Sequence, residues 1–199
     1  MNAPFFTRHP FLKDLLSITV FVACVVIGTL LINSFVFRSF NVQGPSMEPT
    51  MYTGDRLIVN RLPVTAAQLR GVSYTPERGD IIVFKNPHYS RGVDTEYIVK
   101  RVIAFAGERV TVKDGMLTVY NDEFPRGFNP DDQNNGEPTS PTSGDVDVVV
   151  PTGELFVSGD HRDGNFSYDS RNGLGTIPTY DIVGPVSFRI FPFTAMRSF

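Results

Sequence analysis

The sequence is poor in the residues that build disulfides and metal sites. It has a single cysteine, Cys24, so no intramolecular disulfide can form and no cysteine-based zinc site can be built. Its three histidines, His9, His88 and His161, are scattered along the chain, which argues against a metal enzyme. We therefore expect no metal site.

An excess of basic charge is also absent. Eighteen Lys and Arg residues stand against 21 Asp and Glu residues, whereas a nucleic-acid-binding protein usually shows a basic excess. With 41% hydrophobic and 20% charged residues, the composition excludes a disordered or collagen-like chain. At 199 residues the chain is long enough for one domain with a core, and 17 Gly and 15 Pro favour β structure over a helix bundle.

The one long apolar run lies near the N-terminus. Residues 15–37 carry no charge, and 23 helical residues would span a bilayer core of roughly 30 Å. A buried helix of a soluble protein is normally shorter, and a cleaved signal peptide has an apolar region of about 7–15 residues before a small-x-small site. We therefore predict an uncleaved transmembrane anchor. A slight excess of positive charge in residues 1–14 predicts a short cytoplasmic tail.

The remainder, residues 38–199, predicts a β domain. Short alternating apolar runs typical of strands cover residues 56–60, 80–85, 97–103, 109–112, 116–120, 146–150, 154–158 and 182–190. Asp114-Gly115 is a strong hairpin signal, and only residues 65–70 look helical. Residues 128–145 are polar and predict a long exposed loop or a partly ordered insertion, which makes 108–150 a hairpin and polar-loop insertion. This pattern favours a mainly β fold, an antiparallel barrel or sandwich.

The first candidate for chemistry is Ser46, in a Gly/Pro-rich segment, residues 43–50. A serine in such a turn is usually only a turn residue. However, Ser46 lies nine residues beyond Phe37, so even an extended chain holds it within about 30 Å of the bilayer surface. Any function of this segment is therefore expected close to the membrane surface.

The second candidate is Lys100. Alternate residues of a strand share a face, so Lys100 shares its face with Ile98 and Val102. A lysine held in apolar surroundings can lose its charge, and the neutral amine can take a proton from a serine hydroxyl. The alternative is an ordinary strand lysine whose tip reaches water.

The third candidate is the segment 158–171, which is dense in Asp, Arg, Ser and Gly. A calcium loop needs oxygen ligands at regular spacing, but Arg162 and Arg171 interrupt the acids, which suits ion pairs better. A surface turn with local ion pairs is the simpler alternative. A Ser-His-Asp triad of Ser46 with His161 is a further possibility, although nothing in the sequence specifies a partner for His161.

Together these segments resemble bacterial type I signal peptidase, the membrane-anchored serine protease family of the Ser-Lys dyad class. The resemblance covers nearly all of the chain after the anchor, and the anchor fits as well. Each motif alone is weak, but five follow in the family's order: residues 46–50, 54–59, 78–85, 97–103 with Gly107-Glu108, and 159–163 with 167–171.

The resemblance implies a role for each matching residue. Ser46 would be the nucleophile and Lys100 the general base, while Ser167 would orient the lysine amine. Asp169 and Arg171 would form an ion pair that braces the site. Asp160 and Arg162 match supporting positions, and Met47 and Pro49 belong to the nucleophile motif and would lie at the substrate.

Two departures from the family's best-known form concern the site. Gly44 stands where that form has a serine donating to the oxyanion, so the oxyanion hole would rest on backbone N–H groups, including that of Ser46. Two extra residues near 164–166 predict a bulge in the backbone at this place.

The family's substrate is an exported preprotein with small residues at the first and third positions before the cut. The resemblance implies no cofactor, no metal and no nucleic acid, with signal peptides and membrane lipid as partners. The catalytic domain would stand on the extracytoplasmic side of the cytoplasmic membrane, held by a single span. Two alternatives remain: a Ser-Lys processing peptidase with a narrow substrate set, and a membrane-tethered β module that binds without catalysis.

Overall fold

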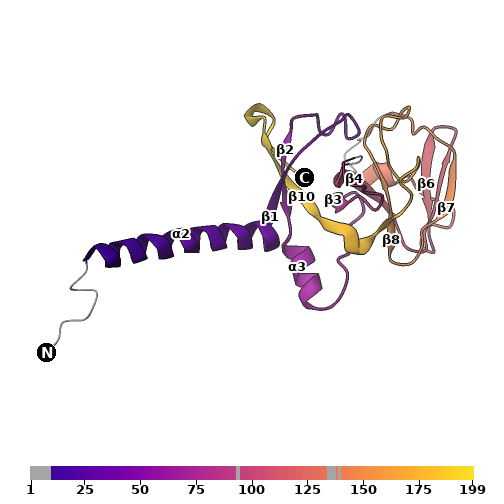
Figure 1. Ribbon diagram of the computed structural model, residues 1–199. Coiled ribbons are helices and arrows are strands. Elements are labelled where there is room, and N and C mark those ends of the chain that lie inside the picture. The colour runs from indigo at the N-terminus through magenta and orange to yellow at the C-terminus, as the bar shows by residue number, and fades with distance from the viewer. Residues whose placement is uncertain (1–9, 93–94, 134–137, 139) are drawn as a thin grey trace.

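The computed structural model describes residues 10–92, 95–133, 138 and 140–199. Helix α2 (Pro10–Phe35) extends away from the β body (Figure 1). It is long and apolar enough to cross a membrane from Phe11 to Phe35, and its side chains are not buried by the rest of the protein. The helix ends two residues before the end of the predicted span, residues 15–37, and strand β1 begins at Phe37. Most of the predicted tail, residues 1–9, lies outside the described residues.

The β body has the predicted antiparallel, barrel-like character. Among the described residues, one antiparallel sheet has the strand order β1-β2-β10-β3-β4-β8-β9, with β11 paired to β10, and it curls on itself (Figure 1). Its strands are β1 (Phe37–Asn41), β2 (Arg56–Asn60), β3 (Ile81–Lys85), β4 (Tyr97–Phe105), β8 (Glu154–Ser158), β9 (Ile177–Pro178), β10 (Ile182–Phe191) and β11 (Arg197–Ser198). The mainly β prediction is confirmed.

A second, three-stranded sheet lies at the end of the body farthest from α2 (Figure 1). It consists of β5 (Arg109–Lys113), β6 (Met116–Tyr120) and β7 (Val146–Val149) in the order β6-β5-β7. Asp114 and Gly115 both have positive φ, 51° and 78°, as a tight two-residue hairpin requires. Apolar residues of β5 and β6 share one buried cluster with Ile103 and Phe156, so this sheet packs against β4 and β8.

The polar segment 128–145 is not simply an exposed loop. It contains the short 3₁₀ helix η1 (Pro130–Gln133), and Asp131 and Thr142 are buried. The expectation of exposure is therefore wrong at these positions, because Asp131 pairs with Arg162 of the main body. Residues 134–137 and 139 lie outside the described residues.

Strand β10 joins the two halves of the main sheet, because its first residues pair with β3 and its later residues with β2. A Cβ at Gly184 would lie 2.2 Å from the carbonyl oxygen of Asn60, so only glycine lets the strands approach there. The helix α3 (Leu62–Leu69) begins three residues before the predicted helix, with a proline in its first turn. The remaining 3₁₀ helices are η2 (Thr179–Asp181) and η3 (Phe193–Ala195).

Candidate active site

Ser46 lies in the loop between β1 and β2, and this loop is fastened to the body. Met47 and Met51 are fully buried in the core cluster that the sheet around β2 and β10 forms. Backbone hydrogen bonds between Val42 and the Gly54-Asp55 pair close the base of the loop. Burying two large side chains next to Ser46 fixes the backbone that carries its hydroxyl.

Lys100 points at Ser46 from the middle of β4. Its Nζ lies 2.7 Å from Ser46 Oγ and donates to the carbonyl oxygen of Val99 at 2.9 Å. Lys100 is only 3% exposed, which contradicts the alternative of a lysine whose tip reaches water. Burial lowers the pKa of Lys100 from 10.5 to about 8, although the charges of Asp169 and Asp160 act in the opposite direction.

This pair can move a proton. A buried amine with a pKa near 8 is neutral in a substantial fraction of molecules around neutral to mildly alkaline pH. The neutral amine has a lone pair and lies within hydrogen-bond reach of the Ser46 hydroxyl. Such an arrangement can activate the hydroxyl as a nucleophile.

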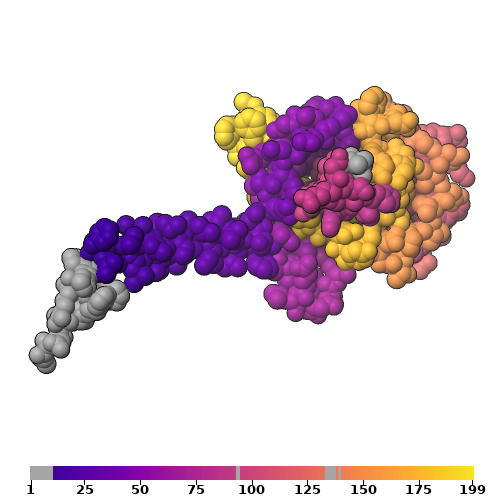
Figure 2. Space-filling view, viewed as in Figure 1, coloured from indigo at the N-terminus to yellow at the C-terminus, as the bar shows by residue number. Residues whose placement is uncertain are grey.

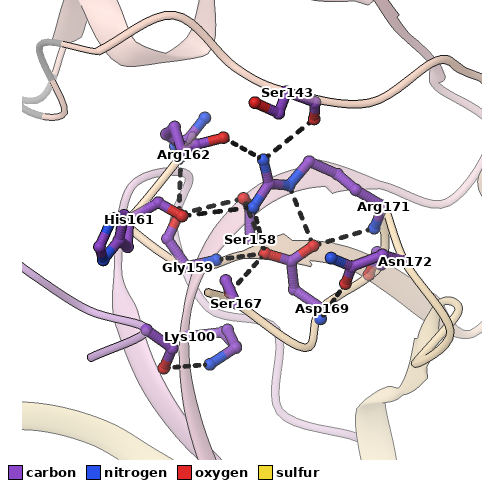
Figure 3. A network of polar contacts seen from close by, with 12 residues as sticks. Lys100, Ser143, Ser158, Gly159, His161, Arg162, Ser167, Asp169, Arg171 and Asn172 are labelled. Carbon is purple, nitrogen blue, oxygen red and sulfur yellow. Dashed lines mark hydrogen bonds and ion pairs between the residues drawn. The ribbon is translucent and has the colours of Figure 1, made fainter. Parts of the chain in front are cut away.

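The segment after β8 forms a polar network near Lys100 (Figure 3). Asp169 accepts hydrogen bonds from Ser167 Oγ at 2.6 Å, from the N–H of Gly159 at 2.9 Å and from two guanidinium nitrogens of Arg171. Burial alone would raise the pKa of Asp169, but the hydrogen bonds and charge of Arg171 outweigh it and lower that pKa. Asp169 is therefore an ionised, fully partnered carboxylate.

Gly159 lets this network reach the nucleophile. A Cβ at this position would lie 2.2 Å from both Ser167 Oγ and the carbonyl oxygen of Ser46. Ser167 lies between Lys100 and Asp169 in Figure 3. Its hydroxyl donates to Asp169, while the amine of Lys100 has Ser46 and Val99 as its hydrogen-bond partners.

Asp160 holds the opposite side of β4. It is fully buried and accepts from Thr50 Oγ1 at 2.6 Å and from Arg101 Nε and Nη2 at 2.8 and 2.6 Å. The bidentate pair thus ties the segment after β8 to β4 and to the end of the nucleophile loop. Arg101 was not assigned from the sequence, although an arginine in the middle of a buried strand is itself a signal for a buried acid.

A groove runs past the pair and can hold an extended ligand. Its volume is about 470 Å³, and Ser46 and Lys100 lie along it. The loop after β1 forms one wall and β4 the other, and its other lining residues include Phe40, Val42, Leu57, Val83, Tyr97 and Ile98. The walls are largely apolar beside the reactive pair.

Comparison with known proteins identifies the family. The model of the signal peptidase family, peptidase S26, matches residues 12–191. The chain belongs to this family. Signal peptidase I of Bacillus licheniformis is 35% identical over 180 residues, and the alignment covers 86% of each chain. Signal peptidase I T of Bacillus subtilis (strain 168) is 35% identical over 178 residues, with 88% of this chain and 85% of the relative covered. A crystal structure of a signal peptidase I from Enterococcus faecalis V583 aligns over 57% of this chain and 97% of its own, with 24% identity and a TM-score of 0.39.

Two residues of the family's nucleophile motif lie away from the groove. Met47 is buried in the core, and Pro49 is exposed outside the groove lining. The expectation that they contact substrate is therefore not supported, because the turn after Ser46 directs Met47 into the sheet. Met47 positions the loop through packing.

His161 does not form a triad in this signal peptidase family member. Its Nδ1 lies 3.1 Å from the carbonyl oxygen of Pro45, and its Nε2 lies 2.9 Å from Asp163. The ring stacks on Phe166, with centroids 4.5 Å apart. Its backbone N–H donates to the carbonyl oxygen of Ser46 at 3.1 Å. His161 thus holds the backbone on both sides of the Pro45–Ser46 bond, a role the sequence reasoning missed.

Arg162 connects the site to the polar segment between β6 and β7. It is fully buried, donates to both carboxylate oxygens of Asp131 at 2.9 and 2.7 Å, and donates to the carbonyl oxygen of Gly159. Burial raises the pKa of Asp131 and lowers that of Arg162. Ser143 accepts from Arg171 and donates its N–H to the carbonyl of Arg162.

No cluster of His, Cys, Asp and Glu in the described part of the chain could hold a metal ion.

Proposed function

We propose that this chain is a membrane-anchored serine endopeptidase that removes signal peptides from exported preproteins, with Ser46 as nucleophile and Lys100 as general base. The 2.7 Å contact between Lys100 Nζ and Ser46 Oγ, at a lysine buried enough to lose its proton, carries the proposal. The family match and the relatives named signal peptidase I supply the substrate class.

The reaction follows from these positions. Ser46 Oγ attacks the scissile carbonyl carbon while its proton passes to the neutral amine of Lys100. The resulting ammonium gives that proton to the leaving amine as the peptide bond breaks, which leaves the signal peptide esterified to Ser46. Lys100 then takes a proton from water, whose oxygen attacks the ester carbonyl. The Lys100 ammonium returns this proton to Ser46 Oγ as the ester bond breaks, which releases the signal peptide and restores the hydroxyl and the neutral amine.

The backbone around Ser46 supports an oxyanion hole. Within the described residues the N–H of Ser46 donates to no acceptor, so it is free to bind the developing negative charge. Gly44 has a left-handed φ of +85°, which favours glycine there and leaves no side-chain donor. We therefore assign the donor role to the backbone of Ser46.

The supporting residues act through the pair. Asp160 with Arg101 holds the segment after β8 against β4, and Asp169 with Arg171 braces that segment internally. Ser167 donates its hydroxyl to Asp169 within the polar network that also includes the carboxylate's contacts with Gly159 and Arg171 (Figure 3). The apolar walls of the groove suit an extended apolar peptide segment. The small side chains at the first and third positions before the cut are what the family resemblance implies.

The arrangement of the apolar surfaces supports membrane attachment by a single span. The loop around η3 lies on the side of the body from which α2 departs (Figure 2). Phe191, Phe193 and Met196 of this region are 48%, 78% and 59% exposed. We propose that this loop contacts the lipid of the cytoplasmic membrane while the β body stands on its extracytoplasmic side.

The test is cleavage of a labelled preprotein in detergent by the wild type, Ser46→Ala, Lys100→Ala and Lys113→Ala. Lys113 lies in β5 with a side chain 62% exposed, which makes it a matched control. We expect cleavage after the small-x-small site by the wild type and by Lys113→Ala alone. Cleavage by Lys100→Ala would contradict the mechanism. A wild type that cuts only a few of a panel of preproteins would indicate a narrow-range peptidase, and one that cuts none would indicate a binding module.

A further inference from the structure

Two arginines lie where α2 meets the β body. Arg38 is the second residue of β1, and Arg61 directly follows β2 and precedes α3. The N–H of Arg61 donates to the carbonyl oxygen of Val36 at 2.8 Å, and Thr65 Oγ1 donates to that of Phe35 at 2.9 Å. Figure 1 shows α3 beginning beside this junction. Both arginines are therefore fixed at the end of the apolar helix.

The depth of this junction follows from the length of the helix. The 26 residues of α2 make a helix about 39 Å long, whereas the hydrocarbon core of a bilayer is about 30 Å thick. When α2 spans the bilayer, its C-terminal end reaches the level of the lipid headgroups. Arg38 and Arg61 then lie among phosphate groups.

The charge at the junction is uncompensated by the protein. Every other arginine here that is as buried pairs with an acid: Arg78 with Glu108, Arg101 with Asp160, Arg162 with Asp131, Arg171 with Asp169 and Arg189 with Asp55. No carboxylate among the described residues pairs with Arg38 or Arg61, although both are half-buried. Burial, followed by the charge of Arg38, lowers the pKa of Arg61.

The two side chains also leave donors available. Arg38 is held over the rings of Tyr97 and Phe40, with its Cζ 4.5 and 5.1 Å from their centroids, and gives one hydrogen bond to the Tyr97 hydroxyl at 3.2 Å. Within the described residues, Arg61 Nε is buried and has no hydrogen-bond partner. A buried donor left without an acceptor is costly, so a site of this kind favours an anion.

We propose that Arg38 and Arg61 form a binding site for the phosphate of an anionic phospholipid headgroup. Guanidinium groups match phosphate oxygens in geometry and charge. Phe37 and Leu62, the chain neighbours of the two arginines, are 41% and 48% exposed and supply an apolar surface for acyl chains. This neighbourhood favours a lipid over a free phosphate ion. The proposal rests on the proposed membrane anchoring.

The experiment measures lipid retention by the full chain in a neutral detergent, using native mass spectrometry with short-chain phosphatidylglycerol as the probe. The variant is Arg38→Gln with Arg61→Gln. The control is Lys113→Gln with Arg126→Gln, which removes the same charge at exposed positions of the small sheet and its following loop. Inorganic phosphate and phosphatidylcholine are added in separate arms as competitors.

We expect the wild type and the control to bind phosphatidylglycerol about tenfold or more tightly than the double-arginine variant, since each basic residue near an anionic lipid contributes measurably. Equal binding by all three proteins, or equal loss in the control, would overturn the site. Displacement by inorganic phosphate as effective as by phosphatidylglycerol would overturn the lipid assignment. Release of the wild type from membranes by alkaline carbonate would refute the anchoring itself, independently of the site.

Discussion

Lys100 and Arg101 are neighbours in β4, both are buried cations, and they point to opposite faces of the strand. Arg101 has a carboxylate, Asp160, that meets its guanidinium at two points. Lys100 has no carboxylate in contact among the residues that the structure describes, and its amine contacts a hydroxyl and a carbonyl oxygen. One face of β4 is thus fixed by the ion pair of Arg101 with Asp160. The other face carries Lys100, a buried amine that can lose its proton.

The difference shows how a single strand can brace a site and also supply its chemistry. A paired buried charge keeps its ionisation state over a wide pH range, so it serves as a fixed connection. A buried lysine without a carboxylate in contact has its pKa lowered towards neutral pH, so it can act as a base.

The largest effect is expected from Lys100→Arg. The guanidinium keeps the positive charge and much of the length, but it cannot deprotonate at any working pH. We expect kcat to fall by about a thousandfold or more, at the upper end of what general base catalysis contributes. Preprotein cleavage would be measured beside thermal unfolding, which must show a folded protein. Activity near that of the wild type would mean that proton removal does not need Lys100.

On the braced face, Asp160→Asn leaves Arg101 buried without its countercharge. Breaking a buried pair in this way costs about 3–5 kcal/mol of stability. We expect a clear fall in the midpoint of denaturant unfolding. The matched control is Asp147→Asn in the exposed pair with Arg109, which should shift the midpoint far less. Similar shifts in the two variants would contradict the bracing role.

The pH dependence of cleavage should report the unpaired lysine. The base must be deprotonated, and its pKa is about 8, so kcat/KM should rise with pH and level off above that value. Well below the pKa each unit of pH should cost about tenfold, so the rate should fall about fiftyfold between pH 8 and pH 6. A profile from pH 6 to 9.5 on a substrate without titrating groups measures this. A profile that is flat between pH 6 and 8 would show that no such base limits the reaction.

The smallest effect is expected from His161→Ala. This change removes the side-chain contact with the Pro45 carbonyl but keeps the backbone hydrogen bond to Ser46. One hydrogen bond contributes about 0.5–1.5 kcal/mol, so kcat should fall about threefold to tenfold with little change in KM. A loss as large as that of Lys100→Arg would reopen a direct chemical role for His161.

Much of this architecture can be predicted from the sequence, because its signals are local. Alternating apolar runs located β2, β5, β6 and β8 within a residue, and Asp114-Gly115 located the hairpin. Ser46 and Lys100 could be assigned to one site because their motifs occur in the order that the family shows. Strand β1 was missed because Phe37 continues the apolar run of the helix.

The contacts between distant segments could not be predicted. Asp131 belongs to a segment of turn-forming, polar composition, and only the folded chain brings it to Arg162. The same holds for Arg101, whose acid lies 59 residues further along the chain. Composition describes a segment by itself, whereas burial of a charged side chain depends on the segment that covers it.

The junction between α2 and β1 has a consequence for which bonds can be cut. The helix ends at Phe35 and the strand begins at Phe37, with a single residue between them, and Arg61 and Thr65 fasten that turn. Such a connection has no room for a hinge, so the nucleophile stands at a set height above the lipid. Under the proposed anchoring, the helix and the β body together fix the distance between the membrane and the nucleophile. Each residue of extended substrate adds about 3.3 Å, so under this anchoring moving the cut site by two residues shifts it by about 7 Å relative to the nucleophile.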